Sequence, residues 1–170
     1  MARIHVCSLE RVPEMVRSTG ARSLITLIDR GTPVSRPSEI RAERHLFVAV
    51  SDIVKQMDGH ILPSDAHVSE LLDFVRQWDR ADPILIHCFA GVSRSTAAAF
   101  IAACALSPHR NENEIAQAIR RDSPTATPNA RLVAVADSML ERQGRMTAAV
   151  EKIGRGHDCF EGVPFALDLH

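Results

Sequence analysis

The chain has 170 residues, of which 45% are hydrophobic and 24% are charged, as is ordinary for a globular protein able to bury one substantial core. Its net charge of -1, from 20 basic and 21 acidic residues, excludes a general affinity for nucleic acid, which requires a surplus of Lys and Arg. Any anion must therefore be bound by a local arrangement of residues.

The sequence shows neither a signal peptide in its first residues nor closely spaced cysteines. Residues 1–10 have no apolar signal-sequence core, and the longest weakly polar stretch, 95–106, is too short to cross a bilayer. We therefore expect a cytoplasmic protein with no membrane partner. The four cysteines are widely scattered without a CxxC pair, which argues against a disulfide framework and a structural zinc site. In a reducing compartment a thiol is available for chemistry.

The first half of the chain alternates apolar runs with turn-rich segments. We expect, in chain order, a strand (3–8), a helix (9–19), a strand (23–28), a loop with two prolines (31–37), a third strand (45–50) and an irregular loop (52–63). Ser8 is placed to cap the helix and Gly20 to end it. This order of strand, helix and strand is typical of α/β proteins.

The second half is mainly helical. Ser64 is placed to cap a helix with apolar residues at helical spacing, and the continuous apolar run 84–86 predicts a strand buried on both faces. Further helices are expected at 95–105, 111–121 and 129–143, and the last twenty residues are expected to pack loosely. With no linker or repeat, residues 1–170 are interpreted as a single α/β domain: a three-layer-like sandwich with a mainly parallel central sheet flanked by helices.

Residues 87–95, with the sequence HCFAGVSRS, stand between the most apolar strand and the most apolar helix. In open α/β sheets, ligands bind beyond the carboxyl ends of the strands, where this loop is expected. A short loop leading into a helix can turn its amides toward an anion, and Gly91 permits backbone angles closed to other residues. The helix N-terminus and the planar guanidinium of Arg94 favour a phosphate at the same point. The expected phosphate-binding residues are Phe89, Ala90, Gly91, Val92, Ser93 and Arg94.

Cys88 begins this loop, and the same positive field favours its thiolate, the nucleophilic form of a group that ordinarily ionises near pH ~8.5. Ser95 can donate a hydrogen bond to the sulfur, and His87 can order the loop through its ring nitrogens. These parts suit two-step phosphoryl transfer. Cys88 attacks phosphorus while an acid protonates the leaving oxygen, and water then hydrolyses the cysteinyl phosphate.

The stretch resembles the HCxxGxxR[ST] signature of the protein tyrosine phosphatase superfamily, and its compact form resembles the dual-specificity class and its small bacterial relatives. The resemblance spans roughly residues 40–143. It implies a general-acid aspartate on a loop after a strand, and Asp52 follows the apolar run 45–50 at a similar distance from Cys88. It also implies that the Pro-Asn pair at 128–129 opens a late helix, which makes Asn129 a candidate supporting contact to the loop.

Other assignments are open for the acid and for a metal. Asp58 and Asp65 are rivals of Asp52, although Asp65 is placed to charge the first turn of the helix that Ser64 caps. His60 and His67 lie near these aspartates, but their spacing fits no zinc motif, so neither a metal nor a cofactor is expected. Cys7, Cys104 and Cys159 are expected to be inert, with a thiol that protects oxidised Cys88 as the alternative.

Several substrate classes remain open at this point. A phosphoprotein phosphatase of tyrosine or dual specificity is favoured, and a phosphatase of a small metabolite, nucleotide or phosphoinositide is the alternative. The chain contains no tyrosine, so the aromatic phosphotyrosine-recognition loop of larger relatives cannot be placed, and the signature loop lacks the lysines of phosphoinositide-specific relatives. Sulfur transfer is disfavoured by the five residues between Cys88 and Arg94, and a non-catalytic phosphate-binding module is disfavoured by the intact Cys88. The oligomeric state is left open.

Overall fold

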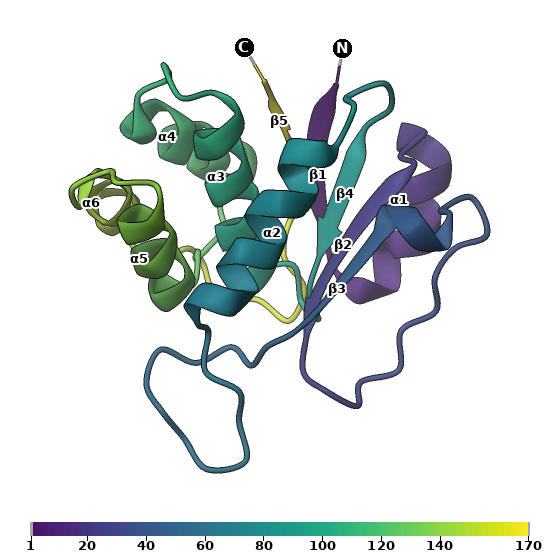
Figure 1. The fold of residues 1–170 in the computed structure, drawn as a ribbon, viewed down its shortest axis with the longest axis horizontal. Coiled ribbons are helices and arrows are strands. Elements are labelled where there is room, and N and C mark those ends of the chain that lie inside the picture. The colour runs from purple at the N-terminus through teal and green to yellow at the C-terminus, as the bar shows by residue number, and fades with distance from the viewer. Residues whose placement is uncertain (1, 170) are drawn as a thin grey trace.

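A five-stranded sheet forms the centre of the computed structural model, which describes residues 2–169. The strands are β1 (Arg3–Cys7), β2 (Ser23–Ile28), β3 (His45–Ala49), β4 (Ile84–His87) and β5 (Phe165–Asp168), in the order β3-β2-β4-β1-β5. The first four are parallel, and β5 runs antiparallel to β1 at the edge. The predicted α/β fold with a mainly parallel sheet is confirmed (Figure 1).

Helices cover both faces of the sheet. They are α1 (Val12–Thr19), α2 (Asp65–Gln77), α3 (Arg94–Leu106), α4 (Glu112–Asp122), α5 (Ala130–Met139) and α6 (Arg145–Ile153), and short 3-10 helices occupy Leu9–Arg11 and Ala42–Arg44. Figure 1 shows α1 on one face and the other helices on the opposite side. A small apolar cluster lies under α1, and the main core lies on the other face.

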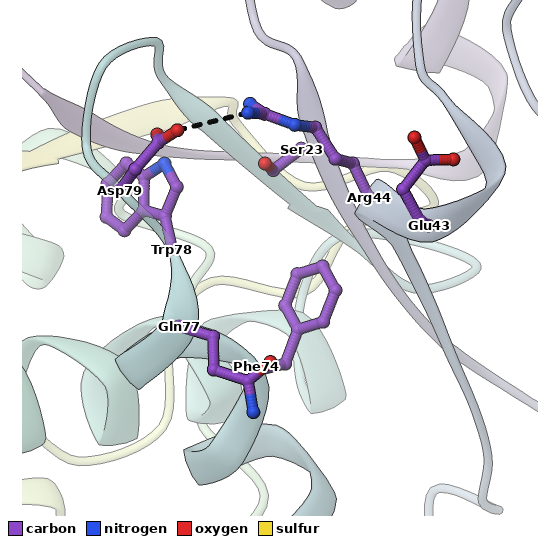
Figure 2. A pocket seen from close by; sticks show the side chains of 7 residues that line it. All are labelled: Ser23, Glu43, Arg44, Phe74, Gln77, Trp78 and Asp79. Atoms are coloured by element: carbon purple, nitrogen blue, oxygen red, sulfur yellow. Dashed lines mark hydrogen bonds and ion pairs between the residues drawn. The ribbon is translucent and has the colours of Figure 1, made fainter.

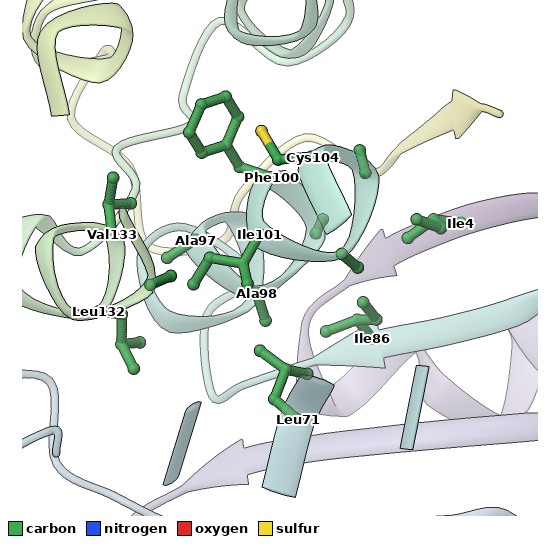
Figure 3. Packing of buried hydrophobic residues seen from close by; sticks show 14 of the residues in the cluster. Ile4, Leu71, Ile86, Ala97, Ala98, Phe100, Ile101, Cys104, Leu132 and Val133 are labelled. Atoms are coloured by element: carbon green, nitrogen blue, oxygen red, sulfur yellow. The ribbon is translucent and has the colours of Figure 1, made fainter. Parts of the chain in front are cut away.

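Helix α3 is the centre of the main core. Every residue from Arg94 to Cys104 is buried, because the helix is apolar all round and packs between the sheet and the outer helices. Figure 3 shows Phe100 and Ile101 of this helix between the sheet, represented by Ile4 and Ile86, and residues of α5. The helix that begins at the signature loop is thus held rigidly on both sides.

Local signals predicted several helix ends correctly. Gly20 ends α1 in the left-handed conformation, with φ of 75°. Ser64 begins α2 in a capping box, in which the His67 ring accepts from the Ser64 backbone amide at 3.1 Å. Ser8 does not cap the first helix with its side chain, because its hydroxyl donates to Glu161 instead at 3.0 Å.

The C-terminal quarter differs from the expectation. The helix predicted over 129–143 ends at Met139, and a separate helix, α6, follows the left-handed Gly144. The carboxylate of Asp137 accepts the amides of Gly144 and Met146, both at 2.7 Å, and so fixes this second helix. Residues 162–169 are not loosely packed, whereas residues 157–160 before them are exposed. The segment 162–169 contains β5, which pairs with β1 through contacts far apart in the sequence.

Candidate active site

The signature loop lies where the parallel strands end. It joins β4 to α3, and β4 is flanked by β1 and β2 in the sheet. Figure 1 shows the segments that follow β2 and β3 leaving the sheet at the same end. Asp29 follows β2 directly, and Asp52 lies shortly after β3. The parallel topology therefore brings two aspartates toward the loop.

The carbonyl groups of the loop are turned outward and paired. The carbonyl of Phe89 accepts from the Leu9 amide at 3.1 Å, and the carbonyl of Ala90 accepts from the Gly162 amide at 2.8 Å. On the other side, the amides of Thr127 and Asn129 donate to the carbonyls of Val92 at 2.9 Å and Ser93 at 3.1 Å. Between residues 88 and 93 of the described structure, only the Gly91 amide has an acceptor, which is the Cys88 sulfur. The other amides of the loop are free to meet an anion.

Gly91 is required by both its conformation and its surroundings. Its φ is +73°, in the left-handed region. A Cβ at this position would lie 2.8 Å from the Cys7 carbonyl carbon and 2.8 Å from the Ser8 nitrogen. The loop is thus packed directly against the end of β1. A side chain at position 91 would prevent this close packing.

Cys88 is 2% exposed at the base of the loop. Its sulfur lies 3.0 Å from Ser95 Oγ, and the Gly91 amide donates to it at 3.3 Å. Both are donors that stabilise a thiolate when it forms. The structure thus brings Ser95 to the sulfur, as the sequence predicted.

Arg94 is buried and has an incompletely satisfied guanidinium. Its Nη1 donates to the Val50 carbonyl at 3.0 Å and lies 3.4 Å from Asp29 Oδ1. Its Nε is the one buried side-chain nitrogen or oxygen without a hydrogen-bond partner in residues 2–169. A buried donor without an acceptor is costly, and such groups usually have a functional reason. Nη1 is therefore anchored to the scaffold, while Nε is left for a ligand.

Asp52 is joined to the loop through one of its two oxygens. Oδ1 accepts from Ser93 Oγ at 2.7 Å and from Asn129 Nδ2 at 2.9 Å, whereas Oδ2 has no hydrogen-bond donor within the part of the chain described. Asn129 also caps α5, where its Oδ1 accepts the Leu132 amide at 2.9 Å. The predicted contact of Asn129 with the loop is made by its backbone, and its side chain contacts the Asp52 loop instead.

The rival aspartates stand apart from this arrangement. Asp58 is an exposed residue of the loop between β3 and α2, and Asp65 lies in the first turn of α2. Neither makes a hydrogen bond to residues 88–94 in the described structure.

His87 is completely buried behind the nucleophile. Burial lowers the pKa of its imidazole to about 4, so the ring is neutral near pH 7. Its Nδ1 lies 2.9 Å from the Cys88 carbonyl oxygen and its Nε2 lies 2.7 Å from Thr26 Oγ1. The ring thus contacts the loop at the Cys88 carbonyl and is itself held by Thr26, a contact that the sequence did not indicate.

The sequence interpretation also missed Asp29, the partner of Arg94. The signal was present, because Asp29 follows a predicted strand in the same way as Asp52. The support from Gly162 could not be found in this way. Gly162 lies far along the chain, and a Cβ there would come 2.4 Å from the Gly91 carbonyl oxygen.

The remaining cysteines have different environments. Burial raises the pKa of Cys7 and of Cys104 to about 12, so both thiols stay protonated near pH 7. Cys159 is exposed and lines a hollow that also includes Asp52 and Ser93. Within residues 2–169 no group of three or more His, Cys, Asp or Glu side chains is arranged to hold a metal ion. No helix in the same range is long and apolar enough to cross a membrane.

Two hollows lie in clearly different places. An open cleft of about 510 Å³ adjoins Asp52 and Ser93 and is walled mainly by apolar groups, namely Ile53, Val54, Met57, Thr127, Pro128 and Ala130, with Lys55 at its edge. A cavity of about 140 Å³ lies at the other end of the sheet, by Ser23, the first residue of β2. Figure 2 shows this cavity with Trp78 and the ion pair of Arg44 with Asp79, which measures 3.0 Å. Only the first of these hollows is continuous with the loop.

Comparisons with known proteins agree with this geometry. Residues 48–126 match the protein-tyrosine phosphatase family. The fold is similar to that of DUSP15, with a TM-score of 0.63, 16% identity, and coverage of 88% of this chain and 90% of that chain. It is similar to human DUSP28, with a TM-score of 0.63, 18% identity and coverage of 82% and 94%. It is also similar to PTPMT1 in complex with PI(5)P, with a TM-score of 0.56, 15% identity and coverage of 88% and 91%. No curated protein sequence matches the chain significantly.

Proposed function

We propose that the chain is a phosphatase of the protein tyrosine phosphatase superfamily, which hydrolyses phosphomonoesters on proteins through a cysteinyl phosphate on Cys88; the match of residues 48–126 to the family and the similarity of the fold to DUSP15 and DUSP28 support this proposal. The observation that carries this proposal is the set of unpaired donors around the sulfur. The amides without an acceptor lie in the loop that begins at Cys88, and the unpartnered Nε belongs to Arg94 at the end of the same loop. A phosphoryl group bound in this loop would satisfy these donors and present its phosphorus to the nucleophile.

In the first step Cys88 Sγ attacks phosphorus, the S–P bond forms and the P–O bond to the leaving group breaks. Negative charge on the three equatorial oxygens is met by the loop amides and Arg94, and such preorganised donors supply most of the rate in phosphoryl transfer. Asp52 gives its proton to the leaving oxygen. Because its Oδ1 is already held by Ser93 and Asn129, the proton is carried by Oδ2.

In the second step water attacks the cysteinyl phosphate. Asp52, now a carboxylate, accepts a proton from that water, the O–P bond forms and the S–P bond breaks. The electron pair returns to sulfur. The thiolate that leaves is stabilised by the Ser95 hydroxyl and the Gly91 amide, which lie 3.0 Å and 3.3 Å from the sulfur. The products are inorganic phosphate and free enzyme.

A phosphoprotein substrate is supported by the cleft beside Asp52. Its walls are mainly apolar and its one cation is Lys55, so it suits uncharged side chains that flank a single phosphorylated residue. Recognition of several phosphates would require more cations than Lys55 in this cleft and Arg155 in the adjoining hollow, and the loop itself carries only Arg94.

A phosphoinositide is the second candidate substrate. It is favoured by the likeness of the fold to PTPMT1, whose structure was determined in complex with PI(5)P. The two candidates differ in the number of charges that the site must neutralise, so they can be separated by direct comparison of substrates.

The test is phosphate release from an aryl phosphate by the wild-type protein and by Cys88→Ser. We expect turnover in the wild type, none in the variant, and retained binding of vanadate by the variant, because the amides and Arg94 remain. Comparable turnover by Cys88→Ser would overturn the covalent mechanism, and vanadate binding without turnover by the wild type would leave only a phosphate-binding module. Relative kcat/KM on phosphopeptides and on PI(5)P then decides the substrate class, and a preference for PI(5)P would refute the phosphoprotein assignment.

A further inference from the structure

Three hydrogen bonds connect the start of β3 to the backbone of the nucleophile. His45 Nε2 lies 2.8 Å from Thr26 Oγ1, Thr26 Oγ1 lies 2.7 Å from His87 Nε2, and His87 Nδ1 lies 2.9 Å from the Cys88 carbonyl oxygen. Thr26 and His87 are directly paired between β2 and β4. We call these three side chains the His45–Thr26–His87 bridge.

The chemistry of the groups assigns each proton of the bridge. The Cys88 carbonyl can only accept, so His87 Nδ1 carries a hydrogen and donates it. Burial lowers the pKa of His87 to about 4, so near pH 7 its Nε2 is an unprotonated acceptor. The Thr26 hydroxyl must therefore donate to Nε2. Its oxygen then accepts from the hydrogen on His45 Nε2.

We propose that Thr26 and His45 are positioning residues, which hold the His87 ring so that it orients the Cys88 carbonyl and thereby aims the loop at the phosphate. The inference rests on the proposed function in that the loop is taken as the phosphate site. The planar peptide bond provides the link, because the Cys88 carbonyl and the Phe89 amide point in opposite directions. Fixing the carbonyl toward His87 therefore directs the Phe89 amide away from it.

The donors also strengthen one another along the bridge. A hydrogen bond accepted at Nε2 polarises the imidazole and makes Nδ1–H a stronger donor, as in other buried networks. Without the Thr26 hydroxyl, Nε2 would be a buried acceptor without a partner, and the ring would be held at one nitrogen only. Thr26 therefore acts on the loop without touching the substrate.

Titration of His45 leaves the bridge intact. His45 is half-buried, and burial together with the nearby Arg36 lowers the pKa of its imidazole. Arg36 comes from the segment after β2, where its guanidinium donates to the Ile40 carbonyl. Whether His45 is neutral or cationic, its Nε2–H still donates to Thr26, so the bridge is a fixed support and does not act as a pH switch.

The test compares Thr26→Val, which removes only the hydroxyl, with Thr26→Ser, which keeps it. We expect Thr26→Val to move the ¹⁵N shift of His87 Nε2 toward that of a free acceptor nitrogen and to weaken vanadate binding about five- to tenfold. Thr26→Ser should restore both. Thr19→Val is the matched control, because it removes a hydroxyl that donates to the Met15 carbonyl at 2.6 Å on α1, away from the bridge.

His45 supplies a second pair of variants at a position that is only half-buried. His45→Gln retains a donor and should resemble the wild type, whereas His45→Leu should show a smaller loss of vanadate affinity than Thr26→Val, because Thr26 still donates to His87. Three results would each overturn the proposal. The first is an unchanged Nε2 shift and vanadate affinity in Thr26→Val, the second is failure of Thr26→Ser to restore them, and the third is an equal loss in Thr19→Val. If Thr26→Val does not fold, equal vanadate affinity in His45→Leu and His45→Gln overturns it. None of these measurements requires turnover, so their failure is distinct from failure of the proposed hydrolysis.

Discussion

Replacing Asp52 by asparagine keeps the contacts of the carboxylate and removes only its proton. Both donors to Asp52, the Ser93 hydroxyl and the Asn129 amide, bind Oδ1, which an asparagine oxygen can replace. The asparagine NH₂ would then take the place of Oδ2, which has no donor to lose in the part of the chain described. We therefore expect the free energy of unfolding to change by less than about 0.5 kcal/mol.

The effect on catalysis should depend on the leaving group. A positioned general acid contributes roughly 10²–10⁴ in rate, or about 3–5 kcal/mol of the barrier. An alkyl phosphate needs this proton, because its alkoxide is a poor leaving group, so kcat should fall by about that factor in Asp52→Asn. An activated aryl phosphate leaves without full protonation and should lose less than roughly tenfold.

The assay is the pH dependence of kcat for an alkyl and an aryl phosphate in parallel. For the alkyl phosphate, the wild type should lose rate on the alkaline side as the acid is deprotonated, and Asp52→Asn should lack that limb. Asp58→Asn, at an exposed position of the same loop, is the control and should behave as the wild type. If Asp58→Asn loses the limb and Asp52→Asn keeps it, the acid is Asp58 and the reasoning from the Oδ1 contacts is wrong.

Other expectations concern the loop and its support. Arg94→Lys keeps the charge but loses the planar guanidinium, so the activation free energy for kcat/KM on an aryl phosphate should rise by about 2–4 kcal/mol. Near-native kinetics would show that Arg94 has only a structural role. Gly91→Ala places a Cβ 2.8 Å from the backbone of Cys7 in a left-handed conformation, so calorimetry should show a lower Tm and assays a loss of turnover; a native Tm would contradict the close packing. The pKa of His87 is about 4 in the folded protein, below the ordinary value of about 6.5, so the unfolded chain binds a proton more tightly. The free energy of unfolding should therefore fall as pH drops from ~6.5 toward about 4, by up to about 3 kcal/mol. Urea unfolding at several pH values should show a smaller loss in His87→Gln, and an equal loss in both proteins would contradict this origin.

The cleft beside Asp52 connects the proposed mechanism to substrate choice. Its apolar wall includes Val54 and Met57, which are 51% and 50% exposed and lie on the loop that carries the acid. The residues that would contact the flanks of a substrate and the residue that protonates its leaving group thus share one segment. Positioning of this segment by Ser93 and Asn129 serves both tasks.

Local patterns in the sequence determined the strand-loop-helix around Cys88. The apolar run before it, the small residues of the loop and the alanine-rich segment after it each favour one conformation, and they agree with one another. The order of strands and helices was likewise sufficient for the α/β fold, whereas Asp52 was proposed from the resemblance to the phosphatase family together with its place after the run 45–50, with Asp58 and Asp65 as rivals. The inferences about strands and helices hold because hydrophobic periodicity and turn residues act over a few neighbours in the chain.

Only the tertiary structure decided which distant groups meet at the loop. The contact of Asp29 with Arg94, the His45–Thr26–His87 bridge and the support of Gly162 all depend on the order and register of strands that are far apart in the sequence. The C-terminal segment illustrates the same limit, because its glycines and polar residues have the local signature of a loose tail, yet β5 is held by pairing with β1. Hydrogen bonds between strands stabilise an extended conformation where the local sequence favours neither strand nor coil. These contacts therefore depend on the order of strands in the complete sheet.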